Sequence, residues 1–240
     1  MSLYDSQVGV LYQITDNKPD KKYSILPTVL SLISSNDLKD KVVLDLGSGT
    51  GFFSHHIANL NPRMVIGIDN SILKIGLASG KEKYPNVLHT LGDIFYHDLP
   101  PSDLTLAAFV LNYAENVVIL KNLFQRIYES LNSGGEFIGV VDLPSGKDLT
   151  HFGAKKHLSS QKDGSPMFIH LYDDEGSETC TLEAIYFRKQ TFEQIAEKVG
   201  FSDFEWCEPI VTEKGKEKYP NMNWVEYLKK PELGYFLAIK

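Results

Sequence analysis

The stretch from Val42 to Phe53, which reads VVLDLGSGTGFF, constrains the fold of this chain more than any other. An apolar run, predicted to be a buried strand, passes directly into a glycine-rich turn, and a helix is expected after it. Because glycine has no Cβ, such a turn can bend tightly and come into contact with a ligand. The helix offers unpaired backbone N–H groups at its start. We therefore expect a strand–turn–helix unit that binds a nucleotide-like cofactor.

The spacing of the glycines, and the acid before them, indicate the kind of cofactor. A dinucleotide-binding turn has the pattern G-x-G-x-x-G, but Phe52 stands where its third glycine belongs. Asp45 ends the strand, and its carboxylate would repel a pyrophosphate and attract an ammonium group. The pattern favours a nucleoside that carries positive charge. The alternative for Asp45 is a purely structural role beside the turn.

Further short apolar runs follow in the same order along the chain, and each ends in polar residues. They are Met64–Ile68 before Asp69, Asn70 and Ser71; Val87–Leu91 before Gly92 and Asp93; and Leu104–Leu111 before Asn112 and Tyr113. Short strands that alternate with helical stretches predict βαβ units and a parallel sheet. An acid about 20 positions after the glycine turn is placed to accept hydrogen bonds from ribose hydroxyls.

In these features the sequence resembles the class I S-adenosylmethionine-dependent methyltransferases, whose first motif has the form seen at the glycine turn. The resemblance implies an α/β fold with a Rossmann-like, seven-stranded, mostly parallel sheet, helices on both faces and an inserted β-hairpin or lid. It implies S-adenosyl-L-methionine as the cofactor and S-adenosyl-L-homocysteine as the product. The cofactor-binding residues that it suggests are Tyr12, Asp45, Gly47, Ser48, Gly49, Thr50, Gly51, Phe52, Asp69, Asn70, Ser71, Gly92, Asp93, Ile94, Phe109 and Asn112.

The resemblance also implies a role for each acid. Asp45 and the glycine turn would hold the methionine end, Asp69 the ribose, and Asp93 the adenine. Two alternatives stay open: Asp69 could simply cap the next helix, and Asp93 could only form a turn. Asn70 departs from the family, which usually has an apolar residue there, so adenine packing would fall to residues such as Ile94.

Candidate catalytic residues are Asn112 and Tyr113, which follow the fourth predicted strand, and His170. Relatives carry a polar or aromatic residue after that strand, close to the methyl group. Asn112 can orient an acceptor but cannot act as a base, and its alternative role is to cap the next helix. Histidine has an unperturbed pKa near neutrality, so His170 is a candidate base, although a surface role is the alternative.

The chain is predicted to form a single domain, 1–240. Its parts are an N-terminal cap (1–40), a cofactor-binding core (41–142), a substrate-covering insertion (143–190) and the C-terminal part of the sheet (191–240). In the insertion, Met167–Tyr172 and Thr179–Arg188 have strand character and flank a turn, which predicts a hairpin. The stretch Ser159–Pro166 is predicted to be flexible. A helix is expected to open with a capping box at Thr191.

Composition limits the classes of partner. The formal net charge is −7 and no dense block of Lys and Arg occurs, which argues against a nucleic-acid partner. The longest apolar-rich stretch is too polar for a membrane span, and the N-terminus lacks the features of a secretory signal. The sequence thus predicts a cytoplasmic protein, monomer or homodimer, with no metal and with a small-molecule methyl acceptor.

The leading hypothesis is methyl transfer to nitrogen or oxygen of a small metabolite, mainly by positioning the acceptor. Two longer runs, one from Phe109 to Val141 and one from Tyr186 to Val211, loosely resemble the toxoflavin-synthase-like small-molecule methyltransferases. One alternative is an NAD(P)-dependent oxidoreductase on a similar fold. Another is a catalytically silent, methyltransferase-like scaffold protein.

Overall fold

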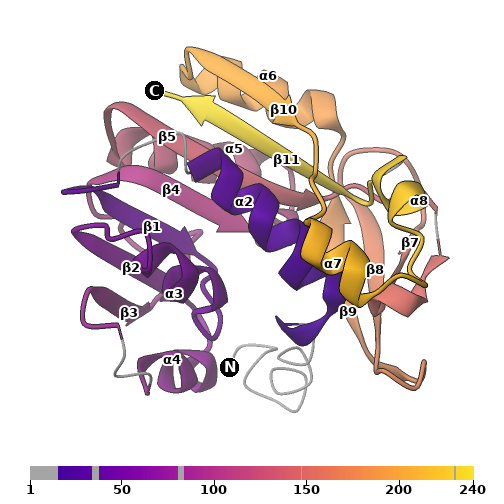
Figure 1. Cartoon of the computed structure of the whole chain (residues 1–240). Coiled ribbons are helices and arrows are strands. Elements are labelled where there is room, and N and C mark those ends of the chain that lie inside the picture. Colours follow the sequence, from indigo (N-terminus) through magenta and orange to yellow (C-terminus); the bar gives the residue numbers. More distant parts are fainter. Residues whose placement is uncertain (1–15, 34–37, 81–83, 147, 230) are drawn as a thin grey trace.

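The computed structural model describes residues 16–33, 38–80, 84–146, 148–229 and 231–240. Within these residues the main sheet has seven strands in the order β10-β11-β5-β4-β1-β2-β3 (Figure 1). Their bounds are β1 Val42–Leu46, β2 Met64–Asp69, β3 Val87–Leu91, β4 Ser102–Ala108, β5 Leu131–Asp142, β10 Asp203–Cys207 and β11 Leu233–Ile239. Strand β11 runs antiparallel to both neighbours, β5 and β10, and the other pairs are parallel. The predicted seven-stranded, mostly parallel sheet is confirmed.

Helices cover both faces of this sheet (Figure 1). On one face α2 (Leu26–Ile33) and α3 (Phe52–Ala58) bury Val29 and Ile57 completely. On the other face α5 (Val117–Ser130) and α6 (Lys189–Val199) bury Phe124 and Phe192 against Phe236 of β11. Each such side chain contributes about 1.5–3 kcal/mol by leaving water. Burial on both faces explains why the central strands β1 and β4 are buried along nearly their whole length, whereas the edge strands β3 and β10 are partly exposed.

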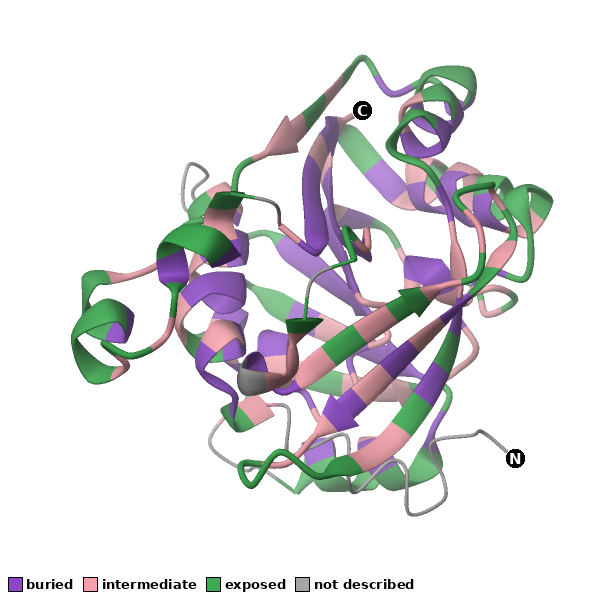
Figure 2. Ribbon diagram, turned by 90° about the vertical axis from the view of Figure 1, so that its right-hand side faces the viewer, coloured by how far each residue is buried: buried purple, intermediate pink, exposed green. Residues whose placement is uncertain are grey.

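The insertion forms a second sheet, antiparallel and larger than the predicted hairpin. Its strands, in the described residues, are β6 (Asp148–Leu149), β7 (Ala154–Leu158), β8 (Ser165–Tyr172) and β9 (Glu178–Tyr186), in that order. The hairpin β8–β9 is confirmed. Strands β6 and β7 were not predicted, and β8 begins inside the stretch expected to be flexible. Burial alternates along β8, as Figure 2 shows, so one face of this small sheet packs inward.

Several element boundaries differ from the prediction. Helix α6 begins at Lys189 after Arg188 in extended conformation, so Thr191 lies inside the helix and the predicted capping box is wrong. Strand β4 ends at Ala108 rather than Leu111, because Phe109 adopts a left-handed conformation with φ of 62°. Helix α4 (Ile72–Ser79) is capped by Ser71 as predicted, but it ends before the expected residue, Tyr84.

Short elements absent from the prediction complete the fold. They are the π-helix η3 (Lys21–Ile25), the 3-10 turns η4 (Leu111–Tyr113) and η5 (Thr150–Phe152), and the helices α7 (Glu213–Lys218) and α8 (Trp224–Lys229). They place Phe152, Trp224 and Tyr227 in one aromatic cluster, with ring centroids 4.9–5.7 Å apart. In the part of the chain that the structure describes, no helix has the length and apolar character needed to cross a bilayer.

Candidate functional site

The glycine turn lies at the carboxyl end of β1 and has the strained backbone that its sequence suggests. Gly47 and Gly49 have φ of +70° and +56°. A Cβ on Gly47 would lie 2.7 Å from Val110 Cγ2, so no other residue fits there without displacing the segment after β4. The amides of Gly47 and Ser48 both donate to the carbonyl of Ile68, which fixes the turn against β2.

Asp69, the last residue of β2, ties this turn to the next helix. Its Oδ2 accepts a hydrogen bond from the Gly49 amide at 2.8 Å, and its Oδ1 accepts one from the Ser71 amide at 2.9 Å. The carboxylate is only 7% exposed, yet it lines the cleft in front of the turn. Asp69 therefore has a structural role in the turn and at the start of the next helix, and it also lies at the ligand cleft.

That cleft has a volume of about 330 Å³ and lies beyond the carboxyl ends of β1, β2, β3 and β4, where open α/β sheets bind ligands. It brings together most of the predicted residues: Gly47, Ser48, Gly49, Thr50, Phe52, Asp69, Asn70, Asp93, Ile94, Phe109 and Tyr113. Other predicted residues do not line it: Asp45, Gly51, Ser71, Gly92 and Asn112. Tyr12 lies outside the described residues.

Asp45 lies beneath the turn. It is 1% exposed, and its Oδ2 accepts a hydrogen bond from Ser54 Oγ at 2.6 Å. Burial raises the pKa of this carboxyl to about 6, although the hydrogen bond from Ser54 opposes the shift. In this structure the carboxylate supports α3 and the turn rather than facing the cleft.

The charges in the cleft suit a cation. Its lining holds the carboxylates of Asp16, Asp69, Asp93, Glu115 and Glu183, against the lysines Lys21 and Lys74. Such a lining disfavours a pyrophosphate and favours a ligand with positive charge. Ser48 Oγ is buried against Gly67 of β2 and has no hydrogen-bond partner among the described residues. The site therefore fits S-adenosylmethionine, a nucleoside with a sulfonium and a zwitterionic amino-acid end.

Asp16 and Lys21 were not predicted to belong to the site. Lys21 Nζ lies 2.6 Å from Asp16 Oδ1 and 4.8 Å from the centroid of the Phe52 ring. Asp16 Oδ2 also accepts a hydrogen bond from Thr50 Oγ1 at 3.2 Å. The two side chains thus place one negative and one positive charge next to the glycine turn.

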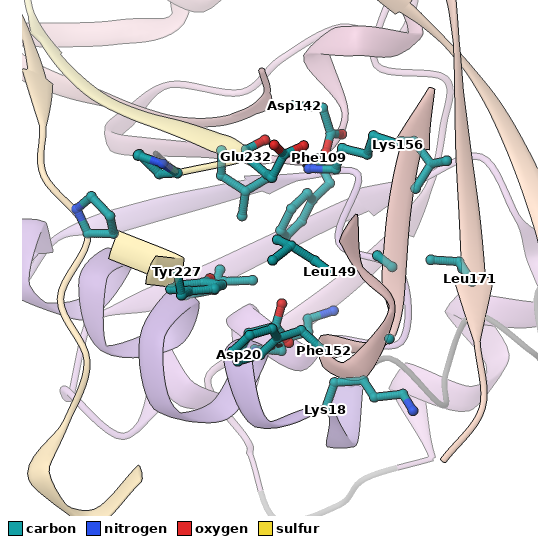
Figure 3. A pocket seen from close by; sticks show the side chains of 18 of the residues that line it. Lys18, Asp20, Phe109, Asp142, Leu149, Phe152, Lys156, Leu171, Tyr227 and Glu232 are labelled. Atoms are coloured by element: carbon teal, nitrogen blue, oxygen red, sulfur yellow. Dashed lines mark hydrogen bonds and ion pairs between the residues drawn. The ribbon is translucent and has the colours of Figure 1, made fainter. Parts of the chain in front are cut away.

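A second, smaller cavity of about 100 Å³ adjoins the cleft. It shares Lys21, Phe109 and Tyr113 with the cleft, so these residues stand at the junction of the two. Figure 3 shows Asp20 and Phe152 on one side of the cavity, and the ion pair of Asp142 and Lys156 with Glu232 on the opposite side. The remaining lining is Lys18, Ile25, Leu149, Gly153, Ala154, Ile169, Leu171, Leu182, Pro209, Tyr227, Pro231, Leu233 and Tyr235.

Asn112 holds the insertion against the sheet. It is completely buried, its Nδ2 donates to the Ile185 carbonyl at 2.9 Å, and its Oδ1 accepts from the Asp142 amide at 2.9 Å. It does not cap α5, because Asn116 does so through the amides of Val118 and Ile119. Asn112 therefore positions the ends of β5 and β9 behind the second cavity.

His170 is not brought to the site. It lies on β8 between Ile169 and Leu171, whose side chains line the second cavity, and so it faces the other way. Its Nδ1 lies 3.1 Å from Glu178 Oε1 and 2.9 Å from Thr181 Oγ1. It lines neither cavity, and its contacts are those of the surface role weighed above.

Sequence reasoning missed residues that reach the site from η3, β7, α8 and β11. Asp20, Lys21, Lys156, Tyr227 and Tyr235 belong to no motif, and no spacing in the sequence connects them. Lys21 stands next to Lys22 in a polar stretch, so the sequence gives it the pattern of a solvent-exposed lysine. Tyr235 has the pattern of an ordinary strand residue.

Comparison with known proteins adds independent findings. Residues 37–200 match a family model described as a methyltransferase domain, which is more than half of the chain. No curated protein sequence matches the chain.

Solved structures share the fold at low sequence identity. An S-adenosylmethionine-dependent methyltransferase from Mesorhizobium loti superposes with a TM-score of 0.67 at 18% identity, over 94% of this chain and 100% of that one. An S-adenosylmethionine-bound amino pentose methyltransferase from Micromonospora echinaspora, involved in calicheamicin biosynthesis, gives 0.64 at 16% identity, over 100% and 98%. Human N-acetylserotonin methyltransferase gives 0.55 at 18% identity, over 88% of this chain and 51% of that one.

Proposed function

This chain belongs to the methyltransferase-domain family, whose members use S-adenosylmethionine, and we propose that it transfers a methyl group to nitrogen or oxygen of a small molecule. The observation that carries the proposal is the junction of the two cavities. The larger, acidic cleft fits the cofactor, and the smaller, largely apolar cavity adjoins it, with Phe109 and Tyr113 lining both. An acceptor in the smaller cavity would meet the cofactor at this junction.

The proposed cofactor contacts follow the chemistry of the cleft. Asp69 would accept hydrogen bonds from the ribose hydroxyls, and Asp93 with Ile94 would hold the adenine. We assign the amino-acid end to Asp16 and Lys21, because their opposite charges, 2.6 Å apart, complement an ammonium and a carboxylate. Asp45 then supports the turn from below through Ser54.

When bound, the cofactor supplies a methyl group on a positively charged sulfur, and the carbon–sulfur electron pair stays on the sulfur after transfer. The task of the protein is to hold the acceptor atom in line with that methyl group and to exclude water. Positioning of this kind can account for roughly 7–11 kcal/mol of a barrier. Phe109, held in its strained backbone conformation, and Tyr113 line both cavities and are suited to this task.

A small acceptor is favoured by the size of the second cavity, about 100 Å³. A cavity of about 150 Å³ accommodates a benzene molecule. By their names, the relatives from Micromonospora echinaspora and human act on an amino pentose and on N-acetylserotonin, both small molecules. The division into a cofactor-binding core, 41–142, and a substrate-covering insertion, 143–190, belongs to the same proposal. The resemblance to toxoflavin-synthase-like enzymes, the cytoplasmic location and the oligomeric state stay predictions.

The test is calorimetric titration of the purified protein with S-adenosylmethionine, S-adenosylhomocysteine and NADH. We expect the two sulfur nucleosides to bind in the micromolar range and NADH not to bind, because the cleft is lined mainly by carboxylates. Binding of NADH alone would favour the oxidoreductase alternative. A panel of small amines and alcohols, assayed for uptake of a labelled methyl group, then tests turnover. Cofactor binding without turnover, together with a stable stoichiometric protein partner, would favour the scaffold alternative.

A further inference from the structure

The pairing of charges in the second cavity indicates which kind of acceptor it can bind. Each of its lysines already has a carboxylate partner. Lys18 Nζ lies 2.6 Å from Asp174, and Lys21 Nζ lies 2.6 Å from Asp16. The third lysine, Lys156, is paired with Asp142. Lys18 and Lys156 are thus neutralised by carboxylates, and Lys21 is assigned to the amino-acid end of the cofactor, so none of the three is left to bind an anionic acceptor.

Lys156 is the most strongly held of them. Its Nζ lies 2.7 Å from Asp142 Oδ1, and both side chains are less than 9% exposed. The same Nζ donates to the backbone carbonyl of Glu232 at 2.8 Å. Because a buried pair of this kind is already neutral, it adds no net charge to the cavity.

Asp20 differs from these carboxylates. Its Oδ1 accepts a hydrogen bond from the Lys21 amide at 2.8 Å, which caps η3. Among the described residues it takes part in no ion pair. Burial raises the pKa of this carboxyl to about 6, and the charges of Lys156 and Lys21 only partly offset the effect. A carboxylate in this state gains from a cation in the cavity.

Tyr235 places a second polar group in the cavity. The side chain is 1% exposed and lines the cavity, and the hydroxyl of Tyr227 lies close to its own hydroxyl. Burial raises the pKa of Tyr235 well above the usual range, so the hydroxyl is neutral. Its oxygen can accept a hydrogen bond from an N–H group.

The rest of the wall is apolar and partly aromatic. Phe109, Phe152 and Tyr227 stand around the space between Asp20 and the charged side of the cavity, as Figure 3 shows. Ile169 and Leu171 of β8 close it from the insertion. This surface suits a compact hydrocarbon body that is smaller than an aromatic ring.

From these observations we propose that the acceptor is a small primary or secondary amine with a compact apolar body, and that Asp20 binds its ammonium group. The inference rests on the proposed methyltransferase function and narrows it to N-methylation. The amine nitrogen gives up one proton, forms a bond to the methyl carbon as the carbon–sulfur bond breaks, and leaves as the methylated ammonium. Asp20 takes up that proton and returns it to water when the product leaves.

The experiment uses small matched probes that differ in the polar group: isobutylamine, isobutanol and isobutyrate. Each is titrated calorimetrically into the full chain saturated with S-adenosylhomocysteine at pH 8. We expect isobutylamine to bind roughly 10- to 100-fold more tightly than isobutanol, and isobutyrate to bind most weakly. Equal affinities, tighter binding of isobutyrate, or no binding of isobutylamine would overturn the proposal.

Asp20→Asn separates the charge from the capping role, because the amide oxygen can still accept from the Lys21 amide. We expect this variant to lose the preference for isobutylamine over isobutanol while S-adenosylhomocysteine binds as before. Asp148→Asn, at an exposed site outside both cavities, is the matched control and should keep the preference. An unchanged preference in Asp20→Asn would overturn the assignment of Asp20.

The pH dependence gives a second readout. The charged and titratable groups that share the cavity with Asp20 are Lys18, Lys21, Asp142, Lys156 of β7, Tyr227 of α8, Glu232 and Tyr235 of β11. Burial raises the pKa of Asp20 to about 6, so isobutylamine affinity should fall as the pH drops through about 6. Affinity that is flat between pH 5 and 8 contradicts the proposal. Failure of S-adenosylhomocysteine to bind would instead refute the methyltransferase function itself.

Discussion

The cofactor cleft and the acceptor cavity adjoin each other but are constructed differently. The cleft is formed mainly by backbone turns at the ends of successive parallel strands, and its residues, apart from Glu183 of β9, lie in the first half of the chain. The cavity is formed by side chains from η3, β5, the insertion, α8 and β11, which are distant in sequence. The turns are fixed by local backbone conformation, whereas the cavity is fixed by packing and ion pairs.

This difference predicts which kind of substitution disturbs each region. The cleft depends on positions where a Cβ cannot be placed, such as Gly47. The cavity depends on buried charges that must stay paired, such as Asp142 and Lys156. Backbone changes should therefore affect the cofactor, and changes of charge in the cavity should affect stability and the acceptor.

The largest expected effect is on stability, from Lys156→Met. Removal of the lysine leaves Asp142 buried without its partner, which costs about 3–5 kcal/mol. The melting temperature, measured by calorimetry, should fall by roughly 10 °C for a chain of this size. Lys155→Met, in an exposed pair with Asp148, is the matched control and should change it little. An equal effect of the two variants would mean that the buried pair does not hold the cavity together.

Gly47→Ala should affect the other region. The added Cβ meets Val110 at 2.7 Å in a left-handed conformation, so the turn must shift away from the cofactor. We expect S-adenosylhomocysteine affinity to fall about 100-fold, a loss of about 2.7 kcal/mol. Gly146→Ala has a similar φ of +84° and no atoms within 4 Å, so it imposes the same backbone strain without the clash. A loss of affinity in both variants would point to general strain instead.

Asp69→Asn tests the carboxylate that connects the turn with the cleft. The amide keeps one acceptor oxygen and loses the charge, so either the Gly49 or the Ser71 hydrogen bond must weaken. We expect about a 10-fold loss of S-adenosylhomocysteine affinity by calorimetry. Unchanged affinity would refute the ribose assignment and leave Asp69 with only its structural role.

The smallest effect is expected from Asp20→Asn on stability. The folded state raises the pKa of Asp20 from 3.8 to about 6, so folding disfavours the ionised form. The cost is fully present above pH 6, shrinks as the pH falls through the window from 6 to 3.8, and is absent below it. Because solvent screens a half-buried group, we expect a gain of about 1 kcal/mol at pH 8, seen as a melting temperature about 2–4 °C higher.

At pH 4 the same variant should melt close to the unmodified chain. A gain of equal size at both pH values would mean that the amide stabilises the cap of η3 rather than relieving a charge. If Asp20→Asn both stabilises the chain and loses the amine preference, the region maintains Asp20 at the expense of stability, as functional sites often do.

Much of the cofactor half could be predicted because its determinants are local. Strand β1 with its glycine turn, the acid at Asp69 and the cap at Ser71 each depend on neighbours in sequence, and the structure has them as expected. The seven-stranded, mostly parallel sheet followed from the resemblance. The orientation of Asp45 toward Ser54 could not be predicted, because it depends on how α3 packs under the turn.

The second half was predicted less well for a physical reason. Strands β6 and β7 are short and half-exposed, so their hydrophobic pattern is weak. The capping box at Thr191 was plausible locally, but Arg188 is held in extended conformation by its contacts with Asp163, so the helix begins earlier. The sequence identified His170 as a titratable side chain, but it could not show on which face of β8 that side chain lies.

The sequence by itself therefore determined the family, the parallel sheet and the cleft in front of the glycine turn, because backbone turns are encoded by a few adjacent residues. Only the tertiary structure decided which side chains meet in the acceptor cavity. Asp20, Lys156 and Tyr235 come from segments more than 70 residues apart, and their burial and charge pairing exist only after the insertion has packed on the sheet. The recognition of the acceptor depends on those contacts, and no local pattern encodes them.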